Sequence, residues 1–143
     1  MKVKIKKLSP NAVIPRYARP GDAGLDLTAV EVENGSNGIV IYRTGLAFEI
    51  PEGYVGYVFP RSSVSFKHLQ MANSVGVIDS SYRGEVTVVF RNTADRYWKD
   101  GYYRIGDRVA QLVIMPRPYV TFEEVDTLSQ TLRGEGGYGS TGN

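Results

Sequence analysis

The sequence predicts an all-β fold in a single domain. Short apolar or alternating runs, rich in β-branched and aromatic residues, recur along the 143 residues and are separated by 16 Gly and 7 Pro residues. No segment shows a helical apolar period of useful length. Many short strands divided by turn residues are typical of a sandwich, a jelly roll or a barrel, and the pattern leaves these three open.

The strands can be placed in chain order from their alternation. Val3 and Ile5 alternate with lysines, which indicates an edge or outer strand. The run 25–30 alternates apolar with polar residues and places Asp26 on the polar face. Further strands are predicted at 39–42, 45–50, 54–59, from about 68, at 108–115 and at 119–124. Between two of them, 60–63 is predicted to open a single helical turn with Ser62 near its cap.

The segment 73–84 combines an acid with an aromatic ring. Asp79 ends an apolar run, Tyr82 follows three residues later, and the β-branched run 85–90 comes next. This order predicts a β-hairpin in which Asp79 shares the core-facing side of Val77. A buried carboxylate needs compensation, which indicates function. Because Asp is also a common turn residue, a plain turn-former explains Asp79 equally well on this pattern alone.

Composition restricts the available chemistry. The chain has no Cys and one His, His68, to which we assign a structural role, so thiolate sites and multi-His cages are excluded. Carboxylates, hydroxyls, arginines and backbone amides remain, and they suit phosphate and Mg²⁺. A net charge of +2 does not predict nucleic-acid binding. Without a signal-like or membrane-spanning run, we expect a cytoplasmic protein with no membrane partner.

Two further segments have an unusual composition. The last residues, 133–143, are rich in glycine and carry one Arg, one Tyr and two hydroxyl residues. Such a segment is either a disordered end or an anion-binding nest that is mobile when free, and we favour phosphate binding. The aromatic segment 92–104 is predicted to be a loop that packs on the core or lines a subunit interface. A surface for a regulatory protein partner is the alternative.

Five motifs occur in one order along the chain. They are Ala23-Gly24-Leu25-Asp26-Leu27, Pro60-Arg61-Ser62-Ser63, Asn73–Gly84, Gly106-Asp107-Arg108-Val109-Ala110-Gln111-Leu112, and Arg133-Gly134-Glu135-Gly136-Gly137-Tyr138-Gly139-Ser140-Thr141-Gly142. With this order and spacing, nearly the whole chain resembles the trimeric dUTPases. The resemblance implies a jelly-roll-like β-clip fold and a homotrimer whose active sites are shared between subunits. It divides the chain into a domain at 1–132 and a flexible arm at 133–143.

The resemblance also implies the reaction: hydrolysis of dUTP to dUMP and pyrophosphate with Mg²⁺, which keeps uracil out of DNA and supplies dUMP for dTMP synthesis. In this reading Asp79 orients and deprotonates the water that attacks the α-phosphorus. Asn73 and the backbone around Val77 and Ile78 read the edge of the uracil. Tyr82 lies under the deoxyribose and excludes a 2′-hydroxyl, so UTP is expected to be a poor substrate.

The phosphate contacts are implied in the same way. The resemblance assigns them to Arg61, Ser62, Ser63 and Gln111. Asp26 would contact the waters of Mg²⁺ rather than the ion itself. The arm would close over a neighbouring subunit's site, with Tyr138 stacked on uracil. Its terminal-phosphate clamp would consist of Arg133, Gly139, Ser140 and Thr141.

Three positions depart from the family pattern, and two other functions stay open. Ser63 stands where Gly is usual, Tyr138 where Phe is common, and Ser81 where an acid is frequent. One alternative is a dCTP deaminase or a bifunctional deaminase–diphosphatase, which would use a glutamate near the base where this chain has Asp79. The other is a nucleotide-gated binding protein that engages partners when dUTP orders its arm.

Overall fold

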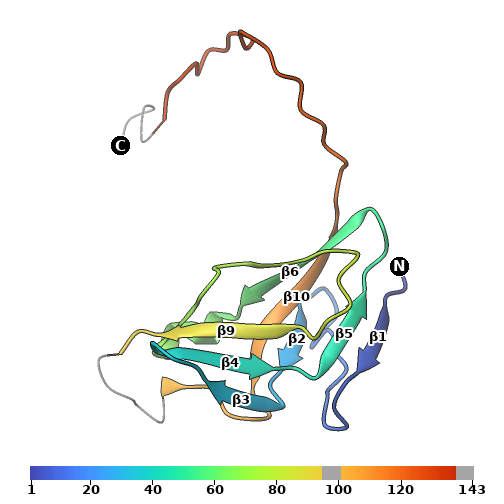
Figure 1. The fold of residues 1–143 in the computed structure, drawn as a ribbon, viewed down its shortest axis with the longest axis vertical. Helices are drawn as coiled ribbons and strands as arrows, with labels where there is room; N and C mark the ends of the chain where they lie inside the picture. The colour runs from blue at the N-terminus through green and yellow to red at the C-terminus, as the bar shows by residue number, and fades with distance from the viewer. Residues whose placement is uncertain (95–100, 138–143) are drawn as a thin grey trace.

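The computed structural model describes residues 1–94 and 101–137, and their regular structure is almost entirely β (Figure 1). The strands are β1 Lys4–Lys7, β2 Leu25–Thr28, β3 Glu31–Asn34, β4 Ile39–Arg43, β5 Leu46–Glu49, β6 Tyr54–Pro60, β7 Leu69–Met71, β8 Gly76–Ile78, β9 Thr87–Asn92 and β10 Arg108–Pro116. One 3₁₀ turn, η1 at Ser62–Phe66, interrupts them. Within these ranges, no helix has the length and apolar character needed to cross a membrane.

The strands form three sheets. One four-stranded sheet has the order β2-β10-β6-β8, the other has the order β3-β4-β9-β7, and β1 pairs with β5 in a small third sheet. All the pairings are antiparallel. The inner faces of the sheets share one apolar core, in which Leu27 and Leu112 of one four-stranded sheet join Tyr42 and Phe90 of the other. The all-β class predicted from the sequence is therefore confirmed.

Most predicted strands are present within a residue or two of their expected ends, and one strand was not predicted. The unpredicted strand, β3, has the sequence Glu-Val-Glu-Asn, so Val32 alone could have indicated it. It pairs with β4 across a tight turn in which Asn37 has a φ of 56° and Gly38 a φ of 73°. Asn and Gly tolerate this left-handed backbone, so the turn signal was present although the strand pattern was not.

The expected hairpin at 73–90 is wrong. β8 pairs with β6, whereas β9 pairs with β4 and β7 in the other sheet. The eight residues 79–86 therefore cross between the sheets, and the turn within them does not pair β8 with β9. The expected facing is also wrong, because Val77 is 60% exposed and Asp79 is exposed. The inward-facing residue of β8 is Gly76, which lies so close to Val58 that there is little room for a side chain.

The expected strand at 119–124 is also absent from the described chain. After β10 ends at Pro116, residues 117–137 rise away from the body (Figure 1), and nearly all of them are exposed. A strand needs a neighbour to accept and donate its backbone hydrogen bonds, and this segment has none within the described ranges. Its apolar side chains, including Phe122 at 97% exposure, are left without a packing partner.

The described part of the aromatic segment packs inward. Tyr102 and Tyr103 are buried in the core cluster, and the Tyr103 ring meets the rings of Tyr42 and Phe90. This confirms core packing for these two residues of the segment 92–104. Residues 95–100 lie outside the described ranges.

Candidate active site

The first group of predicted site residues lies where β2, β10 and β6 run side by side. Asp26 in β2 is the register partner of Gln111 in β10, which is in turn opposite Phe59 in β6. Alternation buries Leu27 and therefore turns Asp26 outward. The Asp26 carboxylate accepts hydrogen bonds from Arg61 Nε at 2.7 Å and from Arg108 Nη1 at 3.0 Å. Each carboxylate oxygen thus holds one arginine beside the strand ends.

Gln111 is held in this group by a hydrogen bond to the backbone of Pro60 and by close packing against Gly24. Its Nε2 donates to the carbonyl oxygen of Pro60 at 3.3 Å. A Cβ atom at Gly24 would lie 2.6 Å from Gln111 Oε1, so glycine at position 24 leaves room for the amide. The motif around Asp26 therefore supplies both a partner for the arginines and the space for Gln111.

The helical turn η1 follows directly on β6 and carries the two predicted phosphate-binding serines. The turn forms as predicted, but its cap position is Arg61 and has no side-chain capping bond. The Ser63 hydroxyl lies 3.0 Å from the hydroxyl of buried Tyr103, while Ser62 is exposed. The aromatic segment thus anchors the turn through Tyr103, and Ser62 remains open to a ligand.

The second group surrounds the turn after β8. Val77, Ile78, Asp79 and Tyr82 line a cleft of about 240 Å³, together with Glu85, Val86 and Thr87. The Tyr82 ring is 44% exposed, and its hydroxyl donates to the Glu85 carbonyl oxygen at 3.0 Å. The exposed Asp79 carboxylate makes no hydrogen bond or ion pair with any residue in the described ranges. Asp79 is therefore a charged acceptor available to a water or a substrate.

Of the remaining predicted site residues, the structure describes Asn73 and Arg133. Asn73 is exposed on the connection between β7 and β8. Arg133 lies far along the exposed segment, where its Nε donates to the Gly136 carbonyl oxygen at 2.9 Å. It is thus not brought to either group. The remaining arm residues, Tyr138, Gly139, Ser140 and Thr141, lie outside the described ranges.

The two groups are not adjacent within one chain. Register pairs Ile78 with Gly56 and Gly76 with Val58, so Asp79 lies level with the start of β6. Arg61 follows the other end of the same strand. Six residues of extended chain separate these levels by roughly 20 Å. A single subunit therefore presents the acid and the arginines at opposite ends of one strand.

Sequence reasoning missed three residues of these groups. Arg108 and Gly24 belong to the quoted motifs but received no role. Glu85, which lines the cleft beside Asp79, was treated as part of a strand. No sequence signal indicated Arg108, because the register of β10 against β2, which places position 108 beside the strand that carries Asp26, is set only in the tertiary structure.

The acidic side chains of the two groups decide whether the protein alone could hold a metal. Among the described residues, no group of three or more His, Asp or Glu side chains is placed to hold an ion. Asp26 is engaged by two arginines, so it fits the predicted contact through water better than a direct bond to a cation. Mg²⁺ characteristically keeps several waters and binds through substrate phosphates, which this arrangement allows.

In comparisons with known proteins, the chain matches the dUTPase family. A model of the dUTPase family matches residues 10–142. The chain is 44% identical to the deoxyuridine 5'-triphosphate nucleotidohydrolase of Thermobifida fusca, over 99% of this chain and 79% of that protein. It is 46% identical to the enzyme of the same name from Cutibacterium acnes, over 90% of this chain and 85% of that protein.

Solved structures agree with the sequence matches. The Staphylococcus bacteriophage 80alpha dUTPase, as a mutant with dUpNHpp, superposes with a TM-score of 0.85 at 29% identity and covers 99% of both chains. The dUTPase of phage phi11, described as coordinating a structural Mg(II) ion, superposes with a TM-score of 0.75 at 29% identity, over 89% of this chain and 98% of that one. On its fold, its motifs and these relatives, the chain belongs to the dUTPase family.

Proposed function

We propose that the protein hydrolyses dUTP to dUMP and pyrophosphate, as the names of its relatives indicate for them. The observation that carries the proposal is the Asp79 carboxylate, which is exposed, unpaired among the described residues and placed beside Tyr82 in a cleft. A general base must reach a water and must not be occupied by another partner. Asp79 meets both requirements.

In the proposed reaction Asp79 accepts a proton from water, whose oxygen forms a bond to the α-phosphorus. The bond from this phosphorus to the bridging oxygen breaks, and pyrophosphate leaves with the electron pair. Arg61 and Gln111 would stabilise the charge on the phosphate oxygens, together with the hydroxyls of Ser62 and Ser63. Preorganised donors of this kind are effective because they need not reorient during the reaction.

Selection of the base is proposed to use the free edge of β8. Within the described part of the chain, this strand lies at the end of its sheet and pairs only with β6. An edge strand presents unpaired backbone N–H and C=O groups, which can match the edge of uracil. Val77 and Ile78 belong to this strand, and Asn73 lies just before it. Cytosine would leave these groups mispaired, which gives strong discrimination.

Tyr82 is proposed to select the sugar. Its ring is partly exposed in the cleft beside Asp79, where a deoxyribose can rest against it. A 2′-hydroxyl would press into the ring, so UTP would bind poorly.

Mg²⁺ is proposed as the cofactor. The residues described would hold it through the substrate phosphates and waters, with Asp26 as an acceptor for one of those waters. When bound, the ion would neutralise charge on the phosphates. The phage phi11 relative, whose description names a structural Mg(II) ion, supports use of the metal in the family.

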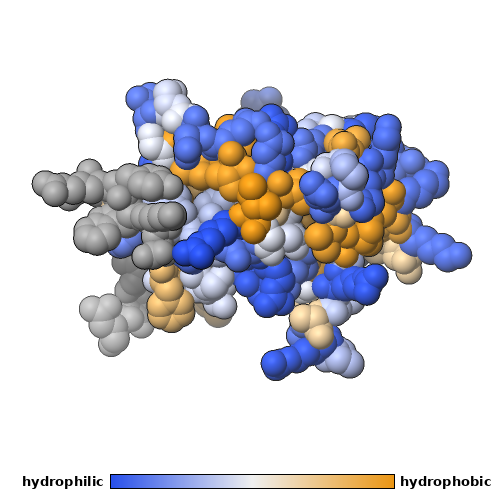
Figure 2. All heavy atoms as spheres, turned by 90° about the horizontal axis from the view of Figure 1, so that it is seen from below, coloured by the Kyte–Doolittle hydropathy of each residue, from blue (hydrophilic) through white to orange (hydrophobic). Residues whose placement is uncertain are grey.

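A homotrimer with shared sites is proposed from the separation of the two residue groups. Because Asp79 and Arg61 lie at opposite ends of β6, a complete site requires Asp79 of one copy and Arg61 of another. Figure 2 shows apolar side chains gathered in continuous areas on the face of the body away from the exposed tail, and such areas mark contact sites. The arm 133–143, following a domain at 1–132, would then close over a neighbour's site through Arg133, Tyr138, Gly139, Ser140 and Thr141.

The proposed compartment is the cytoplasm. Nucleoside triphosphates are intracellular metabolites, so an enzyme that removes dUTP and supplies dUMP acts where they are made. Cell fractionation with an antibody to the protein would check this placement.

The function is tested by pyrophosphate release with Mg²⁺ from dUTP, dCTP, dTTP and UTP. We expect turnover of dUTP alone, and a loss of about 10²–10⁴-fold in Asp79→Asn with dUTP still bound. Ammonia released from dCTP would show the deaminase alternative instead. Binding of dUTP without turnover of any substrate would support the nucleotide-gated binding protein.

A further inference from the structure

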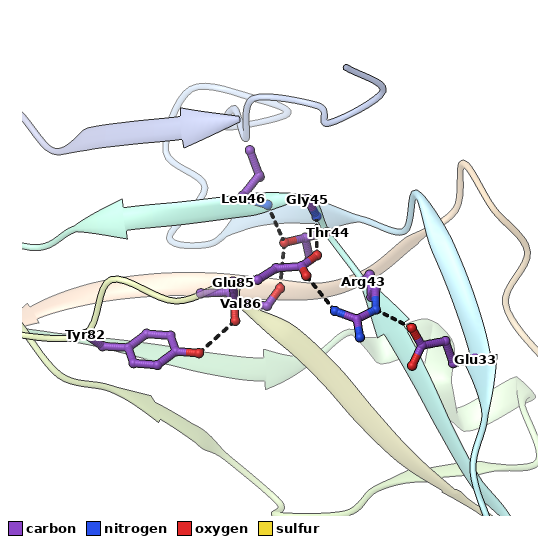
Figure 3. Close-up of polar contacts among 8 residues, drawn as sticks. All are labelled: Glu33, Arg43, Thr44, Gly45, Leu46, Tyr82, Glu85 and Val86. Atoms are coloured by element: carbon purple, nitrogen blue, oxygen red, sulfur yellow. Dashed lines mark hydrogen bonds and ion pairs between the residues drawn. The ribbon is translucent and has the colours of Figure 1, made fainter. Parts of the chain in front are cut away.

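A polar network attaches the chain that follows the turn with Asp79 and Tyr82 to the junction of β4 and β5 (Figure 3). The buried Thr44 hydroxyl donates to the Val86 carbonyl oxygen at 2.6 Å, and the Val86 amide donates to the Leu46 carbonyl oxygen at 2.9 Å. These bonds join the junction of β4 and β5 to the chain entering β9. They fix the chain just after the turn, not the turn itself.

Glu85 extends this attachment toward the cleft. One carboxylate oxygen accepts from the Gly45 amide at 2.8 Å and the other accepts from Arg43 Nη1 at 2.8 Å. The Glu85 side chain is 19% exposed, so its contacts are partly shielded from water. Arg43 is shared with Glu33 on its other side, through Nε. Glu33 and Glu85 raise the pKa of Arg43 above its ordinary value by accepting hydrogen bonds from it.

Tyr82 depends on the same residue through the backbone. Its hydroxyl donates to the Glu85 carbonyl oxygen, and its ring lies over Gly84, where a Cβ would come within 2.6 Å of Tyr82 Cζ. The other hydrogen bonds of the turn among the described residues are internal: the Tyr82 amide donates to the Asp79 carbonyl, and Arg83 donates to the Ser80 and Tyr82 carbonyls. Internal contacts hold the shape of a turn but not its position on the body.

We propose that Glu85 is a positioning residue for the sugar site: its carboxylate, clamped between the Gly45 amide and Arg43, places the Tyr82 ring in the cleft. The inference rests on the proposed function, because it assumes that Tyr82 contacts the sugar. Glu85 acts through Tyr82 and is not a catalytic residue. Its loss should therefore change which sugar is accepted more than it changes the chemical step.

Glu85→Gln and Glu33→Gln form a matched pair of test variants. The glutamine at position 85 keeps an acceptor for the Gly45 amide but turns an N–H₂ group toward Arg43, which removes the clamp. Glu33→Gln removes the other partner of Arg43 and leaves the contact with Glu85. The measurements are kcat/KM for dUTP and for UTP, thermal unfolding, and hydrogen exchange of the peptide covering 79–86.

We expect Glu85→Gln to lower the preference for dUTP over UTP by about tenfold and to speed exchange in 79–86, as loss of a charged hydrogen bond predicts. Glu33→Gln should leave both the preference for dUTP and the exchange in 79–86 unchanged. A general loss of folded enzyme would lower both rates equally and would not move their ratio. In a Tyr82→Ala background, Glu85→Gln should produce no further change in the ratio, because the ring it places is gone.

The outcomes separate the two proposals. If wild-type protein does not hydrolyse dUTP, the proposed function fails, while faster exchange in Glu85→Gln would still show the clamp on the turn. If dUTP is hydrolysed but Glu85→Gln leaves both the ratio and the exchange unchanged, the positioning role is overturned. An equal change in Glu33→Gln would also overturn it, because Arg43 alone would then explain the effect.

Discussion

The two groups of site residues are held in opposite ways. At the strand ends beside η1, side chains hold side chains: Asp26 binds Arg61 and Arg108, and its own side chain is only 17% exposed. At the turn after β8, backbone hydrogen bonds hold the turn's shape and attach the chain that follows it, while the Asp79 carboxylate remains without a partner among the described residues. The first arrangement suits a site that must present fixed positive charge to phosphates. The second suits an acid that must be available to a water.

The two groups also differ in the charges that they offer a substrate. The arginine group carries two guanidiniums against one carboxylate, so it retains positive charge for an anion. The turn supplies an acid and a ring, and none of the described residues that line its cleft is a cation. Since roughly 20 Å of β6 separates them, as judged from the rise of an extended strand, the two groups meet only if copies of the chain associate.

The largest expected effect comes from placing the intact Asp79 and the intact Arg61 on different chains. Asp79→Asn and Arg61→Ala should each be nearly inactive alone. After the two variants are unfolded and refolded together, random assembly should restore about one quarter of the sites, because a site needs an intact Asp79 and an intact Arg61 from different copies. The measurement is pyrophosphate release, with each variant refolded alone as the control. No recovery would mean that both groups act within one subunit.

The next effect comes from adding one methyl group to each region. In Gly24→Ala the new Cβ would displace Gln111, and in Gly84→Ala it would displace Tyr82. We expect Gly24→Ala to lower kcat for dUTP roughly ten- to hundredfold, since small misplacements of a positioning group are costly. Gly84→Ala should mainly reduce the preference for dUTP over UTP. If both variants lower kcat alone, the assignment of sugar selection to the turn is wrong.

A smaller difference between the two regions is expected in how much a substitution lowers the free energy of unfolding. Asp26→Asn removes the negative charge between two arginines and turns an N–H₂ group toward one of them, and we expect it to cost about 1–3 kcal/mol in the free energy of unfolding. Asp79→Asn changes an exposed side chain and should stay within about 0.5 kcal/mol of wild type. Urea unfolding of both variants at one protein concentration provides the measurement. Equal destabilisation would show that Asp79 has a structural partner in the assembled protein.

The smallest effect is expected at the pairing of β1 with β5, whose Glu49 lines a cleft together with Ser80, Ser81 and Arg83 of the turn. The hydrogen bond from Lys4 lowers the pKa of Glu49 below its ordinary value of 4.5. A lowered acid pKa stabilises the fold above pH 4.5, and this contribution is lost as the pH falls below it. Glu49→Gln should therefore reduce the melting temperature slightly at pH 7 and not at pH 3. A larger reduction at pH 3 would contradict this sign.

The sequence by itself determined most of the strands and the available chemistry. Alternation located β2, with Asp26 on its polar face, because a strand exposes every second side chain whatever it pairs with. The absence of Cys and the single His limited catalysis to carboxylates, hydroxyls, arginines and amides. Asp79 and Tyr82 are three residues apart, so their presence on one turn is a local property and was predicted correctly.

Only the tertiary structure decided which strands pair and which faces are buried. Local pattern favoured a hairpin of β8 with β9, but β8 joins β6, because a strand's partner is set by packing across the whole core. The same choice turned Asp79 outward and placed it at the far end of β6 from Arg61. Glu85 meets Arg43 from 42 positions away, and no local rule relates residues at that separation. The chemistry of the site could be inferred from residue types, whereas its geometry depends on long-range contacts.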